Sequence, residues 1–413
     1  MLLKWSQKLA PHPLCGRGEK CTDTYMVNAV GISDDASRIV AGTYYQKYPG
    51  AKRSRVDGTY GMYVYDTAGT GTRLFESEYK GDRGIYDVAI SGDGKVVACG
   101  GLFSDGSASP FKPKRGIVQA FEVSTQKRLL DSTDFPARVN AVALSRDGGV
   151  LAAVAEFFVY VFIRQSSGLF PATPHAIPLD GYSDALDVHP GGNWLATADR
   201  KGNVYIVPIT GGVVGSPVTC YIEEPEDPLK PLSPKAAVEF HRVSAARVAD
   251  ALVAASRDFI YLLTPASVQG PPPGPVARYV TADAAGKHAA WGVAIADDAS
   301  FITAVVNDPS SGGAPSTGRL LKLSPAGSVL NKVSQEALAR MPNSTSLDSS
   351  GTRMTACDGY PVDVPGTFYL FDGVGPQPKT HTTTKMCWPM VISADGTGIA
   401  AGDDDNSLFF FTT

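Results

Sequence analysis

Polar and aromatic residues with the chemistry of a ligand site recur at the start of separate apolar, strand-like runs in the sequence. The candidate ligand-binding residues are Asn28, Tyr86, Asp87, Asn140, Asp184, Trp291 and Trp388. Carboxylates and amides beside aromatic rings are groups that typically line small-ligand pockets. The same residue types also start strands for structural reasons, because Asn and Asp bond to loop backbone and aromatic rings pack between sheets. Both interpretations stay open.

The sequence gives weaker support for a metal site, including one for calcium, or a catalytic nucleophile than for a ligand pocket. Cys357 and Cys387 could form a disulfide, bind a metal with His381 and Asp358, or remain buried free thiols. The run DDDN at 403–406 lacks the alternating spacing and the distal Glu of an EF-hand loop. The sequence contains no serine-nucleophile motif, HExxH or P-loop. We therefore predict no metal site and no cofactor, and leave open whether the protein is an enzyme.

Composition narrows the partner classes. Lys and Arg total 37 against 41 for Asp and Glu, a formal net charge of −4, so no overall charge favours nucleic acid or an anionic membrane. No apolar run approaches the length of about 18 residues that spans a bilayer. The N-terminus has no intact signal peptide, which favours a cytoplasmic protein. An exported protein is the alternative if a signal peptide was removed, and Cys15 and Cys21 could then close a small disulfide loop.

The elements that would position these residues come from an internal repeat. A hairpin-like unit such as IYDVAISGDGKVVACGG, with two apolar strands around a tight turn, recurs eight times. Successive copies lie 44 to 58 residues apart when they are aligned on the residue that ends the first strand. We align that residue at Ser33, Ser91, Ser145, His189, His241, Ala296, Asp348 and Ser393. Helical periodicity is nearly absent, and 331–341 is the best helix candidate.

The repeat predicts an all-β propeller. A third β-branched and aromatic strand follows each hairpin, and a fourth run usually follows that. We predict one domain over 1–413 with eight four-stranded antiparallel blades, or seven as the alternative. The last copy ends after its third strand, so residues 1–10 are expected to supply its outer strand and close the ring. The predicted blades start near residues 26, 84, 138, 183, 235, 289, 342 and 386.

Over nearly its whole length the chain resembles the WD40-like β-propellers. ATADRKGNVYIVPI at 196–209 is similar to the segment of that family that ends in its Trp-Asp dipeptide, and VYD at 64–66 and LFDG at 370–373 occupy the place of the dipeptide. No blade has the Trp-Asp dipeptide itself, and the preceding Gly-His signature is missing. Eight blades are also similar to the quinoprotein alcohol dehydrogenases, but this chain lacks their tryptophan docking motifs and adjacent cysteines. A PQQ site is therefore not expected.

In a propeller the first strands line the central channel, which places the candidate residues at one mouth of it. Our alignment puts one residue per copy at the start of the first strand: Asn28, Asp87, Asn140, Asp184, Ala236, Gly292, Ser344 and Pro389. The turns between the first and second strands lie on the opposite face, where their Asp and Gly residues build tight hairpins, and we assign them no function. Asp199 and Asp403 are expected to cap turn backbone.

Two long insertions form a candidate basic lobe next to this mouth. They lie in the first two copies and carry Lys47, Lys52, Arg53, Arg55, Lys112, Lys114 and Arg115. Charged loops on a rigid ring are places where propellers engage partners. The leading hypothesis is a monomeric binding scaffold that uses its loop face, with an anionic protein partner on the basic lobe. The alternative is an enzyme or small-ligand-binding protein with its site at the channel mouth.

Overall fold

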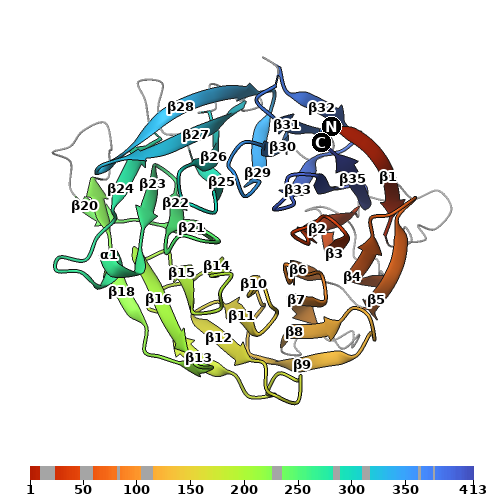
Figure 1. Ribbon diagram of the computed structural model, residues 1–413, viewed down its shortest axis with the longest axis horizontal. Helices are drawn as coiled ribbons and strands as arrows, with labels where there is room; N and C mark the ends of the chain where they lie inside the picture. The colour runs from red at the N-terminus through yellow and green to blue at the C-terminus, as the bar shows by residue number, and fades with distance from the viewer. Residues whose placement is uncertain are drawn as a thin grey trace, which may run out of the picture.

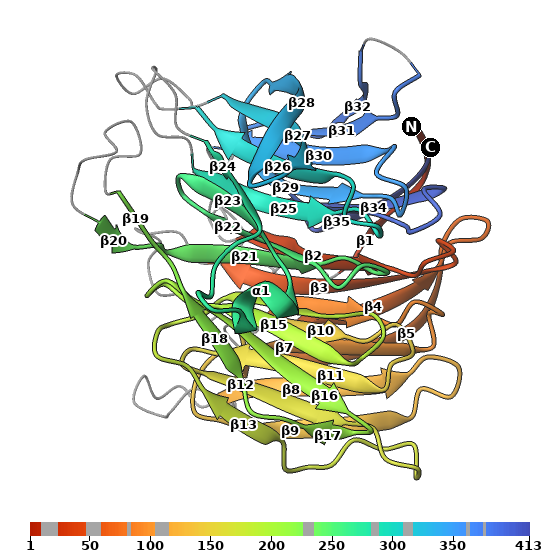
Figure 2. The same cartoon turned by 60° about the vertical axis from the view of Figure 1, so that its left-hand side comes forward.

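The computed structural model describes residues 1–9, 24–46, 59–80, 84–103, 115–225, 235–281, 289–308, 317–360, 364–374 and 377–413. In this part of the chain the strands form eight blades around a central channel (Figure 1). The strands within each blade are antiparallel, the first strand lies innermost, and the strands run side by side through the thickness of the ring (Figure 2). The outer strands of the fifth and sixth blades also pair in parallel, at Arg278 and Val329, which joins these two blades in one sheet. The predicted all-β propeller is confirmed.

The first four blades follow one another along the chain. Blade 1 contains β2 (Thr24–Ile32), β3 (Arg38–Gln46), β4 (Thr59–Asp66) and β5 (Thr72–Lys80). Blade 2 contains β6 (Ile85–Ile90), β7 (Val96–Phe103), β8 (Arg115–Glu122) and β9 (Arg128–Phe135). Blade 3 contains β10 (Ala141–Leu144), β11 (Val150–Ala155), β12 (Phe158–Ile163) and β13 (His175–Pro178). Blade 4 contains β14 (Ala185–Val188), β15 (Trp194–Ala198), β16 (Asn203–Thr210) and β18 (Val218–Tyr221), with β17 (Val213–Val214) also on β16.

The remaining blades complete the ring after a small ribbon of β19 (Glu223–Pro225) and β20 (Lys235–Ala237). Blade 5 contains β21 (Phe240–Ala245), β22 (Leu252–Ser256), β23 (Phe259–Leu263) and β24 (Ala277–Val280), with the short helix α1 (Pro265–Gln269) before β24. Blade 6 contains β25 (Ala290–Ile295), β26 (Ile302–Asn307), β27 (Gly318–Ala326) and β28 (Val329–Leu338). Blade 7 contains β29 (Met341–Leu347), β30 (Met354–Tyr360), β31 (Thr367–Phe371) and β32 (Lys379–Thr382).

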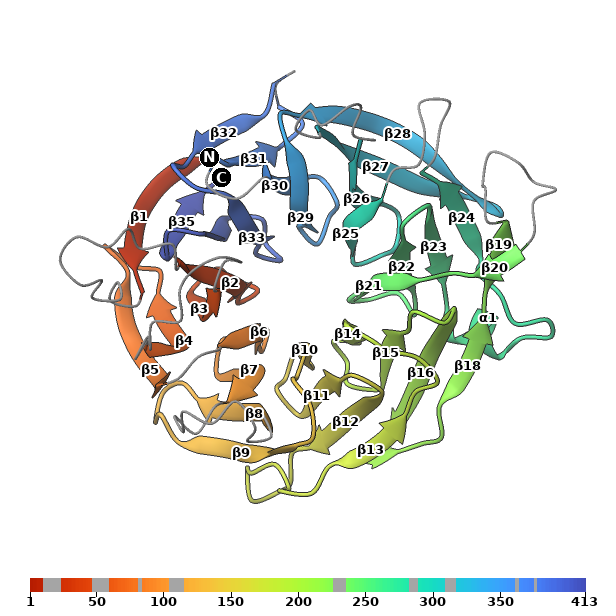
Figure 3. The same ribbon diagram turned by 180° about the vertical axis from the view of Figure 1, so that it is seen from behind.

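Blade 8 joins the two ends of the chain, as the sequence predicts. It contains β33 (Cys387–Ile392), β34 (Gly398–Asp403), β35 (Ser407–Thr412) and, as its outer strand, β1 (Leu2–Lys8). β1 runs antiparallel to β35 from Leu2 opposite Thr412 to Lys8 opposite Ser407. The termini therefore lie together on one blade (Figure 3). Pairing β1 with β35 covers an edge that would otherwise be open to other strands.

Apolar side chains fill the space between neighbouring blades. The cluster between blades 8 and 1, for example, joins Trp5 and Phe410 to Val27 and Tyr63. The hairpin turns between the first and second strands of neighbouring blades are also linked to one another by backbone hydrogen bonds. Asp34 N–H donates to Gly92 O at 2.9 Å, Gly92 N–H to Arg146 O at 2.8 Å, and Arg146 N–H to Pro190 O at 2.9 Å. The series stops at Pro190 because proline has no N–H to donate.

Two predictions of detail are wrong. Residues 331–341, the helix candidate, lie mostly in β28, which pairs with β27 along its whole length. That pairing outweighs the helix propensity of the segment. The second error concerns the fifth copy, where the first strand ends at Ala246 rather than His241. Ala246 N–H closes its hairpin on Ala251 O, as Ser91 N–H does on Val96 O.

Candidate functional site

The hairpin bond fixes which residues are equivalent at the channel mouth. In every blade the residue after the innermost strand donates its N–H to the carbonyl five residues later: Ser33, Ser91, Ser145, His189, Ala246, Ala296, Asp348 and Ser393. The residue five positions before each of these forms what we call the mouth ring: Asn28, Tyr86, Asn140, Asp184, His241, Trp291, Asn343 and Trp388. All of these except His241 of blade 5 line the cavity at this end of the channel.

A β-bulge places most of the mouth ring. The pairing of the two innermost strands shifts register between Val27 and Ala29 in blade 1, and between Ile85 and Asp87 in blade 2. Equivalent shifts occur in blades 5, 6, 7 and 8. The mouth-ring residue is the one that the pairing skips, and a bulge redirects such a side chain.

The structure brings the seven candidate residues together. Asn28, Tyr86, Asp87, Asn140, Asp184, Trp291 and Trp388 all line one cavity of about 470 Å³ at the channel mouth. The sequence alignment nevertheless treats residues from two different positions as equivalent. Four of the aligned residues lie one residue deeper in the channel than the mouth ring: Asp87, Gly292, Ser344 and Pro389. Ala236 is in the ribbon strand β20 and is not equivalent to them. Sequence reasoning missed Arg138, Arg242 and Asn343, which also line the cavity.

The asparagines of the mouth ring connect neighbouring blades. Asn28 Nδ2 donates to Tyr86 O at 2.7 Å, and Asn140 Nδ2 donates to Ser183 O at 3.0 Å. Asn343 Nδ2 donates to Cys387 O at 2.5 Å. Each bond runs from one blade to the next, to a carbonyl in its first strand (Tyr86, Cys387) or two residues before that strand (Ser183). These amides therefore have a structural role that accounts for their position.

Asp87 connects two blades in a similar way. One carboxylate oxygen accepts the N–H of Val88 at 2.9 Å and the other accepts the N–H of Val142, in blade 3, at 2.9 Å. Burial raises the pKa of Asp87 to about 7, while those two N–H groups and the charge of Arg242 act in the opposite direction. Both oxygens are engaged, so Asp87 is placed to hold blades 2 and 3 together rather than to act as a general base.

Asp187 repeats this arrangement deeper in the channel. Its oxygens accept the N–H groups of Val188 and of Ala245 in blade 5, both at 2.8 Å. Burial raises the pKa of Asp187 to about 6. This bond links blades 4 and 5, where Pro190 leaves the series of hairpin bonds incomplete.

Arginine and tyrosine side chains alternate along the part of the mouth formed by blades 2 to 4. The Arg138 guanidinium lies 4.4 Å from the centroid of the Tyr86 ring, and its Nη2 donates to Tyr182 Oη at 3.0 Å. Arg200 lies 4.9 Å from the Tyr182 ring and forms an ion pair with Asp184 at 2.9 Å. Stacking and hydrogen bonds of this kind fix guanidinium groups at a surface.

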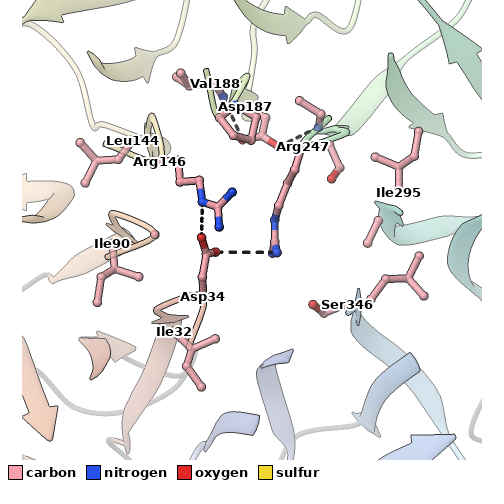
Figure 4. A pocket seen from close by; sticks show the side chains of 16 residues that line it. Ile32, Asp34, Ile90, Leu144, Arg146, Asp187, Val188, Arg247, Ile295 and Ser346 are labelled. Atoms are coloured by element: carbon pink, nitrogen blue, oxygen red, sulfur yellow. Dashed lines mark hydrogen bonds and ion pairs between the residues drawn. The ribbon is translucent and has the colours of Figure 1, made fainter. Parts of the chain in front are cut away.

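The opposite end of the channel carries an ionic cluster from the hairpin turns (Figure 4). Asp34 of blade 1 forms an ion pair at 2.5 Å with Arg146 of blade 3, and lies 3.7 Å from Arg247 of blade 5. Arg247 also lies 3.7 Å from Asp297 of blade 6. Blades 1 and 5 are opposite each other in a ring of eight, so the Asp34 to Arg247 pair spans the channel. Asp34, Arg146 and Arg247 line a cavity of about 240 Å³ there.

The remaining candidate groups fall into two sets. Cys357 and Cys387 are buried free thiols, and Cys357 Sγ donates to Trp388 O at 3.0 Å. Within the described residues no three His, Cys, Asp or Glu side chains are grouped to hold a metal ion. Of the basic lobe, Arg115 is exposed at the start of β8. The other members and the Cys15 and Cys21 pair lie outside the described residues: Lys47, Lys52, Arg53, Arg55, Lys112 and Lys114.

The carboxylates of the turns after the second strand are structural. Asp199 is buried and accepts the N–H groups of Lys201 and Asn203 at 2.9 and 3.0 Å, and the Tyr205 hydroxyl at 2.9 Å. Asp403 accepts the N–H groups of Asp405 and Ser407 at 3.0 and 2.9 Å. No helix in the described part of the chain is long and apolar enough to cross a membrane.

Comparison with known proteins identifies the fold but no close relative. No family model and no curated protein matches the sequence. Sqt1 from Chaetomium thermophilum is similar in structure, with a TM-score of 0.63 and 14% identity over 95% of this chain and 97% of Sqt1. Its complex with the N-terminus of ribosomal protein L10 gives a TM-score of 0.62 and 13% identity over 95% of this chain and 97% of Sqt1.

A second similar structure is the β-propeller domain of Cps50 (Swd1) from Myceliophteria thermophila. Its TM-score is 0.54, with 12% identity over 79% of this chain and 95% of the domain. These are WD40 propellers, and at such identities the likeness concerns the fold alone. The resemblance to WD40-like propellers is therefore confirmed for the fold.

Proposed function

We propose that this propeller is a binding scaffold that takes a protein segment on its channel-mouth face. The observation that carries the proposal is the mouth cavity of about 470 Å³, lined by both aromatic and guanidinium side chains. Large aromatic residues and arginine dominate the energetics of protein interfaces. Trp291 keeps 38% of its surface exposed at the mouth, which makes it available to a partner.

The bonding of the mouth residues favours binding over catalysis. The two oxygens of Asp87 accept backbone N–H groups, and Asp184 is paired with Arg200. A carboxylate that acts as a general base must lie within reach of the substrate proton and have an oxygen free to take it. The rigid ring instead presents side chains that are already held in place, which lowers the entropic cost of binding.

The proposed binding site includes the loop face around the channel mouth. The strands β3 and β7 end on the mouth side, and the insertions that carry the predicted basic lobe follow them in sequence. The Sqt1 propeller was solved in complex with the N-terminus of ribosomal protein L10, so a propeller of this fold accommodates a terminal protein segment. We propose that this chain also binds a protein segment.

A second candidate is a small-molecule receptor at the same mouth. It is favoured by the cavity volume, which falls within the range of about 300–1,000 Å³ of small-molecule sites. The Tyr86 and Trp291 rings would supply its apolar walls. A compound library screened by thermal shift tests this candidate, since a ligand of the mouth raises the melting temperature of the native protein but not of Trp291→Ala.

Peptide selection tests the scaffold function. A random 12-residue peptide library is selected on the immobilised protein, and enriched peptides are labelled and measured by fluorescence anisotropy. We expect Trp291→Ala to weaken binding by tenfold or more. The matched control is Val213→Ala, which removes an exposed apolar side chain from β17, outside the mouth. Failure to enrich any peptide, or equal binding by both variants and the wild type, would refute the function.

A further inference from the structure

Arg138 carries a positive charge that no carboxylate in the described part of the chain balances by an ion pair. Its Nε donates to Asn140 Oδ1 at 2.6 Å, its Nη2 donates to Tyr182 Oη at 3.0 Å, and its plane lies over the Tyr86 ring. These partners are uncharged and together hold the guanidinium in one orientation. These neutral partners leave the charge of the half-buried guanidinium uncompensated, and a guanidinium matches the geometry of a carboxylate.

Arg242 adds a second guanidinium to the same cavity from blade 5. It occupies the position in β21 that Asp87 occupies in β6, one residue deeper than the mouth ring. Its Nη1 donates to the backbone carbonyl of His241 at 2.7 Å. Among the described residues Arg242 forms no ion pair either. The cavity therefore receives two guanidinium groups, one from the loop before the first strand of blade 3 and one from the first strand of blade 5.

The acidic groups of the mouth do not cancel this charge. Asp184 is already paired with Arg200 at 2.9 Å. Asp87 is occupied by two backbone N–H groups. Arg200 lies outside the cavity lining and balances Asp184, so Asp87 is the one lining carboxylate that remains against Arg138 and Arg242. The two guanidinium groups of the cavity thus outnumber the carboxylates that no arginine pairs with, although the whole chain has a net charge of −4.

Apolar surface lies on the remaining blades of the same mouth. Trp291 of blade 6 and Trp388 of blade 8 line the cavity together with Pro389. Arg138 and Arg242 belong to blades 3 and 5. The cavity is therefore polarised, with cationic groups on one arc of the ring and indole rings on the other.

We infer that the channel mouth binds an acidic protein segment, with a carboxylate against Arg138 and Arg242 and a large apolar side chain against Trp291. This inference rests on the proposed function and specifies its partner. Guanidinium groups recognise carboxylates through paired, charge-assisted hydrogen bonds. A cavity of about 470 Å³ accommodates a few side chains, and two fixed cations suit a short acidic motif better than the long phosphate array of a nucleic acid.

The test uses the peptides selected on the immobilised protein. We expect enriched sequences that place Asp or Glu beside Leu, Phe or Trp. For the tightest peptide, replacing every Asp and Glu by Asn and Gln should weaken binding to the wild-type protein by about tenfold to a hundredfold, the value of one or two charge-assisted hydrogen bonds. Raising NaCl from 50 to 500 mM should weaken the acidic peptide more than its amide analogue.

Variants of the protein test whether Arg138 and Arg242 are the residues that bind the acidic groups of the peptide. Arg138→Gln and Arg242→Gln should each weaken the acidic peptide by about tenfold or more and leave the amide analogue almost unchanged. Arg73→Gln is the control, because Arg73 is a half-exposed arginine on the outer strand β5. If a variant does not fold, the comparison of the acidic and amide peptides on the wild-type protein still decides the inference.

The outcomes separate the inference from the proposed function. Enriched peptides that are neutral or basic but depend on Trp291 would overturn the acidic partner and leave the scaffold function standing. No enriched peptide would overturn both. A fluorescein-labelled single-stranded RNA 12-mer that binds in an Arg138-dependent way, while acidic peptides do not, would overturn the choice of a protein partner.

Discussion

Replacing Trp5 by alanine tests whether the N-terminal strand closes the ring in solution. The Trp5 side chain is only 6% exposed, with its ring centroid 5.7 Å from Tyr65 of blade 1 and 5.6 Å from Phe410 of blade 8. It also packs against the backbone of Gly71, where a Cβ atom would lie 2.5 Å from the indole. One side chain thus contacts both blades at the point where the chain ends meet.

The expected loss follows from the buried volume. Replacing a buried Trp by Ala costs about 3–5 kcal/mol in protein cores. With an unfolding entropy of about 2.1 cal/mol/K per residue, a 413-residue chain should then melt about 3–6 °C lower. Thermal melts followed by circular dichroism measure the shift.

Lys4→Ala is the matched control, since Lys4 is exposed on the same strand, and it should melt like the wild type. Deleting residues 1–8 should lower the melting temperature further, because it also exposes the edge of β35. A Trp5→Ala variant that melts within about 1 °C of the wild type would show that β1 does not complete blade 8 in solution.

Three further results are expected. Asp87→Ala leaves the N–H groups of Val88 and Val142 without their acceptor and should lower the unfolding free energy in urea by about 2–4 kcal/mol, whereas Glu76→Ala on the exposed rim should change it little. Because the raised pKa of Asp87 makes the native state bind more protons than the unfolded state between about pH 4 and 7, its contribution to stability should fall as pH rises. Urea curves at pH 5 and pH 7.5 should show a smaller fall for Asp87→Asn, and an equal fall would contradict this assignment. Burial raises the pKa of the Cys357 thiol to about 12, so alkylation by iodoacetamide at pH 8, followed by mass spectrometry, should leave Cys357 unmodified until the protein is unfolded.

The fold could be predicted because each blade repeats local signals. The alternating apolar strands and the Asp-Gly turn of residues 85–101 determine a hairpin without reference to the rest of the chain. The N-terminal strand was predictable because blade 8 lacked a fourth strand in its own copy. The hairpin can be predicted from a short segment of sequence, and the closing strand can be predicted from the number of strands in the last copy.

The register of the mouth could not be predicted in the same way. The bulge at Tyr86 inserts one unpaired residue between Ile85 and Asp87, and its position depends on the pairing with the neighbouring strand rather than on the strand's own sequence. The sequence alignment of the copies therefore places Asp87 where the structure has Tyr86. In the fifth copy the hairpin residue is Ala246, which lacks the Ser or Asp that marks most of the others, so the alignment stopped five residues early.

Contacts between distant blades were also outside the reach of sequence reasoning. Asp34 and Arg247 are more than 200 residues apart and meet only because blades 1 and 5 face each other across the channel. Arg138 precedes the first strand of blade 3 and is positioned by Tyr86 and Tyr182 of the two neighbouring blades. Such contacts depend on the number of blades and on side-chain reach, neither of which is encoded in a single repeat.

The most direct test of a protein-binding channel mouth is a crystal structure of this protein with its tightest selected peptide. We predict peptide density over the mouth ring, with a carboxylate between Arg138 and Arg242 and an apolar side chain on Trp291. Peptide density on the outer rim, or over the Asp34 and Arg146 cluster at the opposite end of the channel, would contradict the account.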